Sequence, residues 1–207
     1  MTLDEALAQC PVVAIVRGVR PEEILDHAQA LFEAGVRGVE VPLNSPEPIE
    51  SLRRLSEAFG DRLVTGAGTV LHADRVDEVA KAGGRIIVAP NTSREVIARA
   101  VALKLDPAPG FATATEAFVA IEAGARHLKL FPAVTYGPAH LKQLKAVLPP
   151  EIVVWAVGGV GAPDFADWWA AGARAFGLGG ELYKAGQSVA ETADKARRVV
   201  EAIRNLH

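Results

Sequence analysis

The sequence predicts a small (β/α)8 barrel, the TIM-barrel fold, preceded by a short N-terminal helix. Apolar, β-rich runs recur about every 20–25 residues, and amphipathic helical patterns separate them. Eight such units form either a closed barrel or an open doubly wound sheet, and a weak repeat built on glycines favours the barrel. We expect one domain over residues 1–207, near the small end of the range for this fold.

Each predicted strand is a short apolar run bounded by turn residues. In chain order the predicted strands are 12–17, 38–43, 63–68, 85–90, 103–110, 127–132, 152–159 and 175–180. The segments between them, such as "EEILDHAQALFEAG" and "ADRVDEVAKAGG", repeat their apolar residues with the period of a helix. The acidic start "MTLDEALAQC" predicts the N-terminal helix and lacks the form of a signal peptide.

The repeat places chemistry-bearing residues in one layer of the barrel. Four predicted helices end at a glycine, where a positive φ is favoured: Gly35, Gly83, Gly124 and Gly172. Five residues after these glycines, on alternate strands, stand Glu40, Val88, Lys129 and Gly177. Alternate strands of a barrel fill the same interior layer. We therefore expect Glu40 and Lys129 to point into the barrel at one height, with Gly177 leaving space for a ligand.

A desolvated lysine beside a carboxylate is equipped for carbonyl chemistry. A neutral lysine amine can attack a ketone to form a Schiff base, and a nearby carboxylate can move protons. Burial lowers the pKa of Lys129 and Glu40 raises it, so the sequence leaves its value open. A buried Glu–Lys pair can also be purely structural. The position of both residues near the carboxyl ends of strands favours catalysis.

Two glycine pairs predict a phosphate site. Gly158 and Gly159 follow the seventh predicted strand, and Gly179 and Gly180 end the eighth. Backbone N–H groups at the starts of helices bind phosphate, and this part of a barrel is a frequent phosphate site. Strand-to-helix turns also favour glycine without any ligand, but two pairs after consecutive late strands favour phosphate.

Other polar groups are predicted at the same end of the barrel. Arg17 ends the first strand, where a guanidinium suits a carboxylate or phosphate, although a plain surface arginine is the alternative. Thr69 follows the third strand and offers a hydroxyl, and Gly66 and Gly68 are expected to let the backbone approach a ligand.

Composition excludes several classes of function. The formal net charge is −3 without a block of like charge, which argues against nucleic acid as a partner. No apolar run is long enough to span a membrane. The single cysteine, Cys10, excludes an intrachain disulfide and makes the cytoplasm the expected location. The five histidines have no metal-ligand spacing, so we expect no metal and no other cofactor.

Seven motifs in order resemble one enzyme family: "VEVPLNSP", "GAGTVL", "PGFATATEAF", "LKLFPA", "YGPAHLKQLKAVLP", "VGGV" and "YKAGQSV". They resemble the class I aldolases of 2-keto-3-deoxy-6-phospho sugar acids, which include 2-keto-3-deoxy-6-phosphogluconate (KDPG) aldolase and 4-hydroxy-2-oxoglutarate aldolase. The resemblance covers about residues 11–196 and is strongest to the 6-phosphogalactonate branch.

The resemblance implies a metal-free homotrimeric barrel whose substrate, a small phosphorylated keto acid, is cleaved to pyruvate and D-glyceraldehyde 3-phosphate. It implies a side activity on 4-hydroxy-2-oxoglutarate. Lys129 would form the Schiff base and Glu40 would shuttle the proton. Arg17 and Thr69 would contact the pyruvate half. The phosphate would lie on backbone groups of Gly158, Gly179 and Gly180.

Three positions depart from patterns in this family. Gluconate-type members usually have arginine where Asn44 stands, and typically threonine where Val157 stands. Many relatives have serine in place of Gly180, so that a phosphate contact here can come only from backbone. Asn44 and Val157 are therefore expected to bias the choice between the galactonate and gluconate epimers.

Two other functions fit part of this pattern. A phosphate-binding barrel isomerase or epimerase would share the glycine pairs without needing Lys129. A non-catalytic phosphate-ligand binding protein would bind phosphorylated sugar acids without consuming them.

Overall fold

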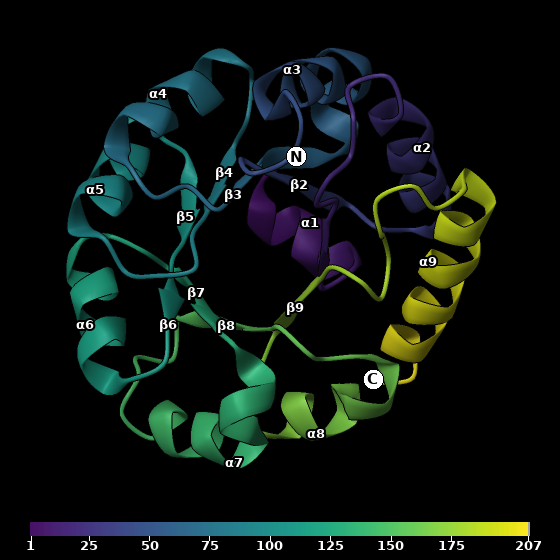
Figure 1. The fold of residues 1–207 in the computed structure, drawn as a ribbon. Coiled ribbons are helices and arrows are strands. Elements are labelled where there is room, and N and C mark those ends of the chain that lie inside the picture. Colours follow the sequence, from purple (N-terminus) through teal and green to yellow (C-terminus); the bar gives the residue numbers. More distant parts are fainter. Residues whose placement is uncertain (207) are drawn as a thin grey trace.

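The strands follow one another around the barrel in the order of the chain. The computed structural model describes residues 1–206. Its strands are β1 (Val12–Ile15), β2 (Gly38–Pro42), β3 (Val64–Gly68), β4 (Ile86–Val88), β5 (Asp106–Ala108), β6 (Gly110–Phe111), β7 (His127–Leu130), β8 (Val153–Val157) and β9 (Ala175–Leu178). Parallel pairing runs in the order β5-β4-β3-β2-β1-β9-β8-β7-β6. A doubly wound sheet would reverse its order once, so that alternative is wrong and the barrel is confirmed (Figure 1).

The predicted fifth strand differs from its expected form. Residues 103–105 form the turn after the preceding helix, and the remainder divides at Pro109 into β5 and β6. β5 pairs with β4, whereas β6 pairs with β7, so this one segment closes the barrel. Proline has no N–H to give to a ladder, but the Pro109 carbonyl accepts from the Lys129 N–H at 2.8 Å.

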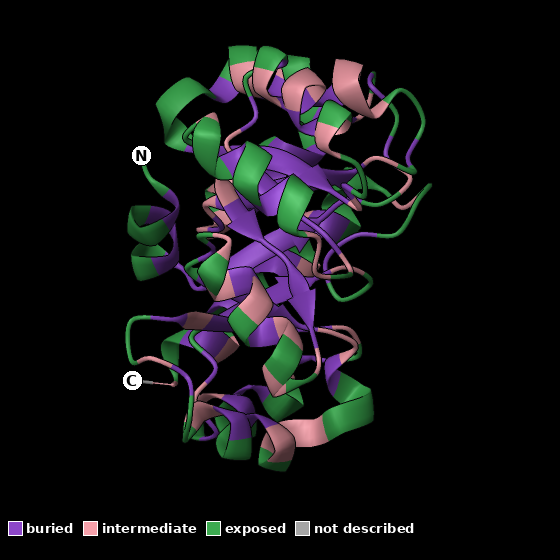
Figure 2. Cartoon of the chain, turned by 90° about the vertical axis from the view of Figure 1, so that its left-hand side faces the viewer, coloured by how far each residue is buried: buried purple, intermediate pink, exposed green. Residues whose placement is uncertain are grey.

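Helices surround the strands on the outside of the barrel. They are α2 (Ile24–Ala34), α3 (Pro48–Phe59), α4 (Ala73–Lys81), α5 (Arg94–Ala102), α6 (Ala114–Glu122), α7 (Ala133–Lys145), α8 (Phe165–Ala170) and α9 (Val189–Arg204), with short 3₁₀ turns at Gly60–Arg62 and Ala162–Asp164. Figure 2 shows buried strands inside and exposed helix faces outside. The four glycines of the repeat all have positive φ, as predicted. None of the helices within residues 1–206 is both long and apolar enough to cross a membrane.

The N-terminal helix α1 (Leu3–Gln9) closes one end of the barrel. Thr2 caps it, and the side chain of Glu5 returns to the Thr2 N–H in a capping box. Leu3 and Leu7 are buried in the cluster that fills the barrel interior together with Val13 and other strand residues. Figure 2 places α1 and both chain ends on the same side of the molecule. The opposite end, where the strands finish, is left for a site.

Candidate active site

Lys129 and Glu40 are both buried inside the barrel. Lys129 on β7 is 6% exposed, and Glu40 on β2 is 2% exposed. The two side chains interact electrostatically with each other and with Arg17. The Lys129 Nζ atom lies 4.7 Å from the centre of the Phe131 ring. The expectation that the lysine and the carboxylate share the barrel interior is confirmed.

Burial acts on both groups in the direction that catalysis needs. Desolvation raises the pKa of Glu40 to about 7, although Lys129 and Arg17 oppose this. Desolvation also lowers the pKa of Lys129, with Arg17 adding to the effect and Glu40 opposing it. Both shifts favour the neutral forms. For Lys129 the neutral form is the nucleophilic amine, and for Glu40 it is the carboxylic acid, which can give a proton.

Glycines in β3 make room for the carboxylate. A β-carbon on Gly68 would overlap Oε2 of Glu40, and one on Gly66 would overlap the Ile86 backbone. The close approach predicted for these glycines is thus made to protein atoms. Within residues 1–206, Glu40 Oε2 is buried without a hydrogen-bond partner. A buried acceptor of this kind is costly unless a substrate or water supplies the proton donor.

A cavity of about 550 Å³ opens at the carboxyl end of the barrel. Eight of the predicted site residues line it: Arg17, Thr69, Lys129, Val157, Gly158, Gly159, Gly179 and Gly180. Gly177 also lines it, as expected from its layer. Glu40 and Asn44 are not among the residues that line it. Thr69 has φ 57°, an uncommon conformation for a threonine, which occurs where the surroundings hold it.

Asn44 contacts Arg17. The Arg17 Nη1 atom donates to Asn44 Oδ1 at 2.5 Å, and the next residue, Ser45, accepts from the Gly18 N–H at 2.9 Å. The loop after β2 thus holds the loop after β1. Asn44 is placed where it orients the guanidinium at the cavity mouth, a placement that sequence alone did not predict.

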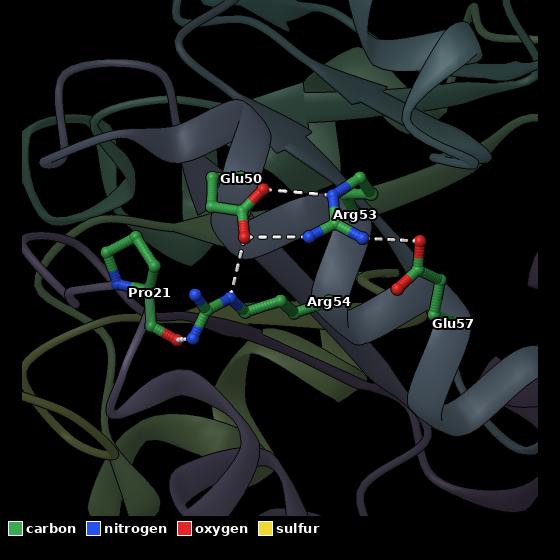
Figure 3. A network of polar contacts seen from close by, with 5 residues as sticks. All are labelled: Pro21, Glu50, Arg53, Arg54 and Glu57. Carbon is green, nitrogen blue, oxygen red and sulfur yellow. Dashed lines mark hydrogen bonds and ion pairs between the residues drawn. The ribbon is translucent and has the colours of Figure 1, made fainter.

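A surface network on α3 supports the loop between β1 and α2. Arg54 donates to Glu50 at 2.7 Å and to the Pro21 carbonyl at 2.9 Å, and Arg53 joins Glu50 to Glu57 (Figure 3). Exposed ion pairs contribute little stability singly, but a network with a shared carboxylate gives defined geometry. It ties the β1–α2 loop, which carries Arg17, to the helix after β2.

The two glycine pairs differ in conformation. Gly158 and Gly159 have φ of 94° and 71°, which other residues adopt only with strain. The Gly179 carbonyl accepts from the N–H groups of Leu182 and Tyr183 at 2.8 Å, which makes a turn after β9. In the described chain neither Gly159 nor Gly180 has a protein acceptor for its N–H. Free N–H groups on a cavity wall suit an anion.

Three of the cavity-wall residues that the sequence did not predict have polar side chains. Glu181, Tyr183 and Lys184 line it from the loop after β9. Among the described residues Lys184 makes no ion pair with a carboxylate. One sequence signal for Lys184 was available, because this lysine stands four residues after Gly180, in a glycine pair predicted to bind phosphate. Over residues 1–206 no group of three or more His, Cys, Asp or Glu side chains is arranged to hold a metal.

Fold and site together define a barrel enzyme built around a desolvated lysine. The model of the KDPG and KHG aldolase family matches residues 3–199, and the chain belongs to this family of aldolases, which are carbon–carbon lyases.

Two curated relatives and one solved structure are particularly similar. The chain is 50% identical to the 2-dehydro-3-deoxy-6-phosphogalactonate aldolase of Escherichia coli K12 over 94% of its length and 95% of that protein's. It is 42% identical to a probable 2-dehydro-3-deoxy-6-phosphogalactonate aldolase of Rhizobium meliloti, covering 90% and 88% of the two chains. The solved native KDPGal structure is 49% identical with a TM-score of 0.94 and covers 96% of each chain.

Proposed function

We propose that this chain is a class I aldolase that cleaves 2-keto-3-deoxy-6-phospho sugar acids to pyruvate and D-glyceraldehyde 3-phosphate. The observation that carries the proposal is Lys129, an amine buried inside the barrel, lining the cavity and interacting with the buried carboxylate of Glu40. Burying a lysine costs stability, and a catalytic role explains why this cost is retained.

The reaction begins with the neutral Lys129 amine. It adds to the C2 ketone of the substrate, and loss of water gives an iminium ion. The iminium accepts the electron pair of the C3–C4 bond when that bond breaks, so the lysine stabilises as an enamine what would otherwise be a carbanion. A flexible, fully solvated lysine would remain protonated at neutral pH, which is why burial matters here.

Glu40 moves the protons. Its carboxylate takes the C4 hydroxyl proton directly or through a water, which allows the aldehyde to leave. It then returns a proton to C3 of the enamine, and hydrolysis of the iminium frees pyruvate and Lys129. A pKa of about 7 equips Glu40 to take and give protons at neutral pH.

Two ends of the cavity suit the two anionic ends of the substrate. Arg17 and Thr69 provide donors for the carboxylate of the pyruvate half. Lys184 and the N–H groups of Gly159 and Gly180 provide a cation and free donors for the phosphate. The geometry thus supports a phosphorylated keto acid over a simple sugar.

The galactonate epimer is the proposed preferred substrate. Two relatives covering most of this chain are named for 2-dehydro-3-deoxy-6-phosphogalactonate. Val157 on the cavity wall offers no hydrogen bond to the substrate, and Asn44 is engaged by Arg17. A weaker side activity on 4-hydroxy-2-oxoglutarate is proposed because that compound has the keto acid but cannot use the phosphate donors.

The test is reductive trapping. Pyruvate with borohydride should label the wild type irreversibly on Lys129, identified by peptide mass, and Lys129→Ala should lose both labelling and cleavage. Lys145→Ala is the matched control, since burial also lowers the pKa of Lys145, which hydrogen bonds the Ile152 carbonyl away from the cavity. Labelling at another lysine, or cleavage retained by Lys129→Ala, would contradict the Schiff-base mechanism. An isomerase or a non-catalytic binding protein would give no adduct.

We also propose a homotrimer in the cytoplasm. Val101 on α5 and Phe118 on α6 are 43% and 37% exposed, and exposed apolar side chains on these outer helices suit a contact between subunits. Cys10 is buried as a free thiol, which suits a reducing compartment. Light scattering coupled to size exclusion should report three times the chain mass, and a monomer would contradict the assembly.

A further inference from the structure

The Gln187 amide is fully engaged by the loop after β9 and by α9. Its Oε1 atom accepts from the Lys184 backbone N–H at 3.0 Å and from Lys195 Nζ at 2.8 Å. Its Nε2 atom donates to the Leu182 carbonyl at 2.8 Å and to Thr192 Oγ1 at 2.7 Å. A primary amide has two N–H donors and two oxygen lone pairs, so no capacity is left over.

Chemistry fixes which way this amide points. The Lys184 N–H and the Lys195 ammonium can only donate, and the Leu182 carbonyl can only accept. A flipped amide would place donors against donors and an acceptor against an acceptor. Gln187 therefore recognises one conformation of the loop.

The loop held in this way is the one that faces the cavity with Gly179 and Gly180. Lys195 also donates to the Gly180 carbonyl, at 3.4 Å. This contact holds the peptide unit between Gly180 and Glu181 from outside, while Gly180, Glu181, Tyr183 and Lys184 form part of the cavity wall. The contacts of Gln187 thus act on the backbone that carries the free N–H and the cation.

The other side of Gln187 is anchored in the protein interior. Thr192 on α9 is fully buried, and its hydroxyl lies 2.8 Å from Nδ1 of His27 on α2. His27 in turn packs edge-on against the Tyr183 ring, with ring centres 4.9 Å apart. The chain His27–Thr192–Gln187 therefore connects two packed helices to the loop. Burial lowers the pKa of His27, which favours its neutral form.

We propose that Gln187 is a positioning residue for phosphate: it fixes residues 179–187 so that the Gly180 N–H and the Lys184 ammonium meet the phosphate of the substrate. Thr192 serves as its buried anchor. This inference rests on the proposed function, since it assumes a phosphorylated substrate in this cavity. It predicts a defect confined to the phosphate end of the substrate, because Lys129 and Glu40 lie on other strands.

The test compares substrates with and without phosphate. Gln187→Ala should raise KM for the phosphorylated keto acid about 10-fold or more, as expected for losing a partly buried network of four hydrogen bonds. The inhibition constant of inorganic phosphate should rise in parallel. The kinetic constants for 4-hydroxy-2-oxoglutarate and the rate of borohydride trapping with pyruvate should stay within about twofold of wild type.

A second pair of variants separates positioning from folding. Thr192→Val keeps the buried shape but removes the hydroxyl, and should give the same KM defect; Thr192→Ser keeps the hydroxyl and should restore it. Gln29→Ala on the exposed face of α2, where Gln29 donates to Glu33 at 2.8 Å, is the matched control and should leave these constants unchanged.

The possible results distinguish failure of the positioning role from failure of the proposed function. An unchanged KM in Gln187→Ala, or an equal loss on both substrates, would overturn the positioning role. If the wild type itself used both substrates with equal efficiency, the phosphate site of the proposed function would be wrong, and this inference would fall with it. Absence of any pyruvate adduct in the wild type would instead overturn the aldolase mechanism.

Discussion

The carboxylate of Glu40 lies directly against the backbone of Gly68, so that any β-carbon at residue 68 would overlap Oε2. The two residues lie on paired strands, with Glu40 aligned to Gly66 and Pro42 to Gly68. The side chain of Glu40 has no free space on that side. Glu40 can therefore occupy its position relative to Lys129 only because residue 68 on β3 is a glycine.

Gly68→Ala should damage cleavage without damaging imine formation. The added methyl group must displace the Glu40 carboxylate, and an error of about 1 Å in a catalytic group can cost roughly 100-fold in rate. Lys129 is not touched by this change. We expect kcat to fall about 100-fold while borohydride trapping of pyruvate persists, measured on the same preparation.

Gly84→Ala is the control for simple steric damage. A β-carbon there would come within 2.6 Å of the Val79 side chain and 2.9 Å of Leu52, away from the cavity. It should lower the melting temperature and leave kcat near wild type. Normal cleavage in Gly68→Ala would show that the close contact between Glu40 and residue 68 does not control proton transfer.

Glu40→Gln should lower the rate of cleavage and raise the stability of the fold. Burial raises the folded pKa of Glu40 to about 7 from an ordinary 4.5. As pH rises between these values the unfolded chain loses the proton first, so the free energy of unfolding falls across this window, by about 3 kcal/mol in total. Glutamine does not ionise and avoids this loss. We expect slower cleavage by roughly 10²–10⁴-fold, retained trapping and a higher melting temperature at pH 8.

The pH dependence supplies the internal control. Near pH 4.5 the carboxyl is protonated in the folded chain, and the stability advantage of Glu40→Gln should shrink toward zero. A wild type more stable than the variant at pH 8 would mean that the carboxylate is stabilised in the fold. The raised pKa would then be wrong.

The sequence predicted that Glu40 and Lys129 lie together inside the barrel because the barrel repeats. A glycine after every second helix sets the phase of the next strand, so equal spacing places these two residues at equivalent positions. The split at Pro109 was missed because "LKLDPAPG" is apolar enough for one strand, whereas only the closing pairs with β4 and β7 reveal the break. A local sequence pattern reveals the periodicity of an element, but it does not reveal which residues pair between strands that are distant in the sequence.

The contacts around the site were beyond prediction for the same reason. Gly68 was expected to let the backbone approach a ligand, whereas its close neighbour is Glu40, which only the β2–β3 register brings there. Asn44 was expected at the substrate, and instead its contact to Arg17 joins residues 27 positions apart. Gln187 looks like an ordinary loop residue until α9 and the loop after β9 are placed together.

Acid should destabilise the fold through His127. Its Nδ1 accepts from Trp155 Nε1 at 3.2 Å, and its Nε2 faces Asp4 at 3.2 Å. Burial lowers its pKa, opposed by Asp4 and assisted by the nearby Arg126. Below pH 6.5 the unfolded chain binds a proton that the folded chain does not, so the free energy of unfolding falls as pH falls.

Unfolding in urea at pH 7.5 and pH 5.5 measures this effect. His127→Gln, which cannot titrate, should lose less stability over that range, by up to about 1.4 kcal/mol per pH unit. His27 contributes in the same direction, because burial lowers its pKa as well, so the variant should keep part of the dependence. An identical pH dependence in both proteins would show that His127 titrates alike in the folded and unfolded chains.

Val157→Thr should shift the choice of epimer toward the gluconate type. The two epimers differ at C4, whose hydroxyl gives its proton to Glu40 in the proposed reaction. Val157 lines the cavity from β8 and cannot hydrogen bond that part of the substrate, whereas threonine has nearly the same shape and adds a hydroxyl. One gained polar partner changes discrimination by about 1–3 kcal/mol. We expect dual activity in the wild type, tilted toward the galactonate epimer.

The measurement is the ratio of kcat/KM for the two epimers in wild type, Val157→Thr and a control. Val153→Thr changes the same strand at its other end, beside α1 rather than the cavity, and should leave the ratio unchanged. Because kcat/KM compares the transition states of competing substrates, the ratio isolates specificity from any general loss of activity. A wild type with a strong gluconate preference that Val157→Thr does not move would show that residue 157 has no part in choosing the epimer.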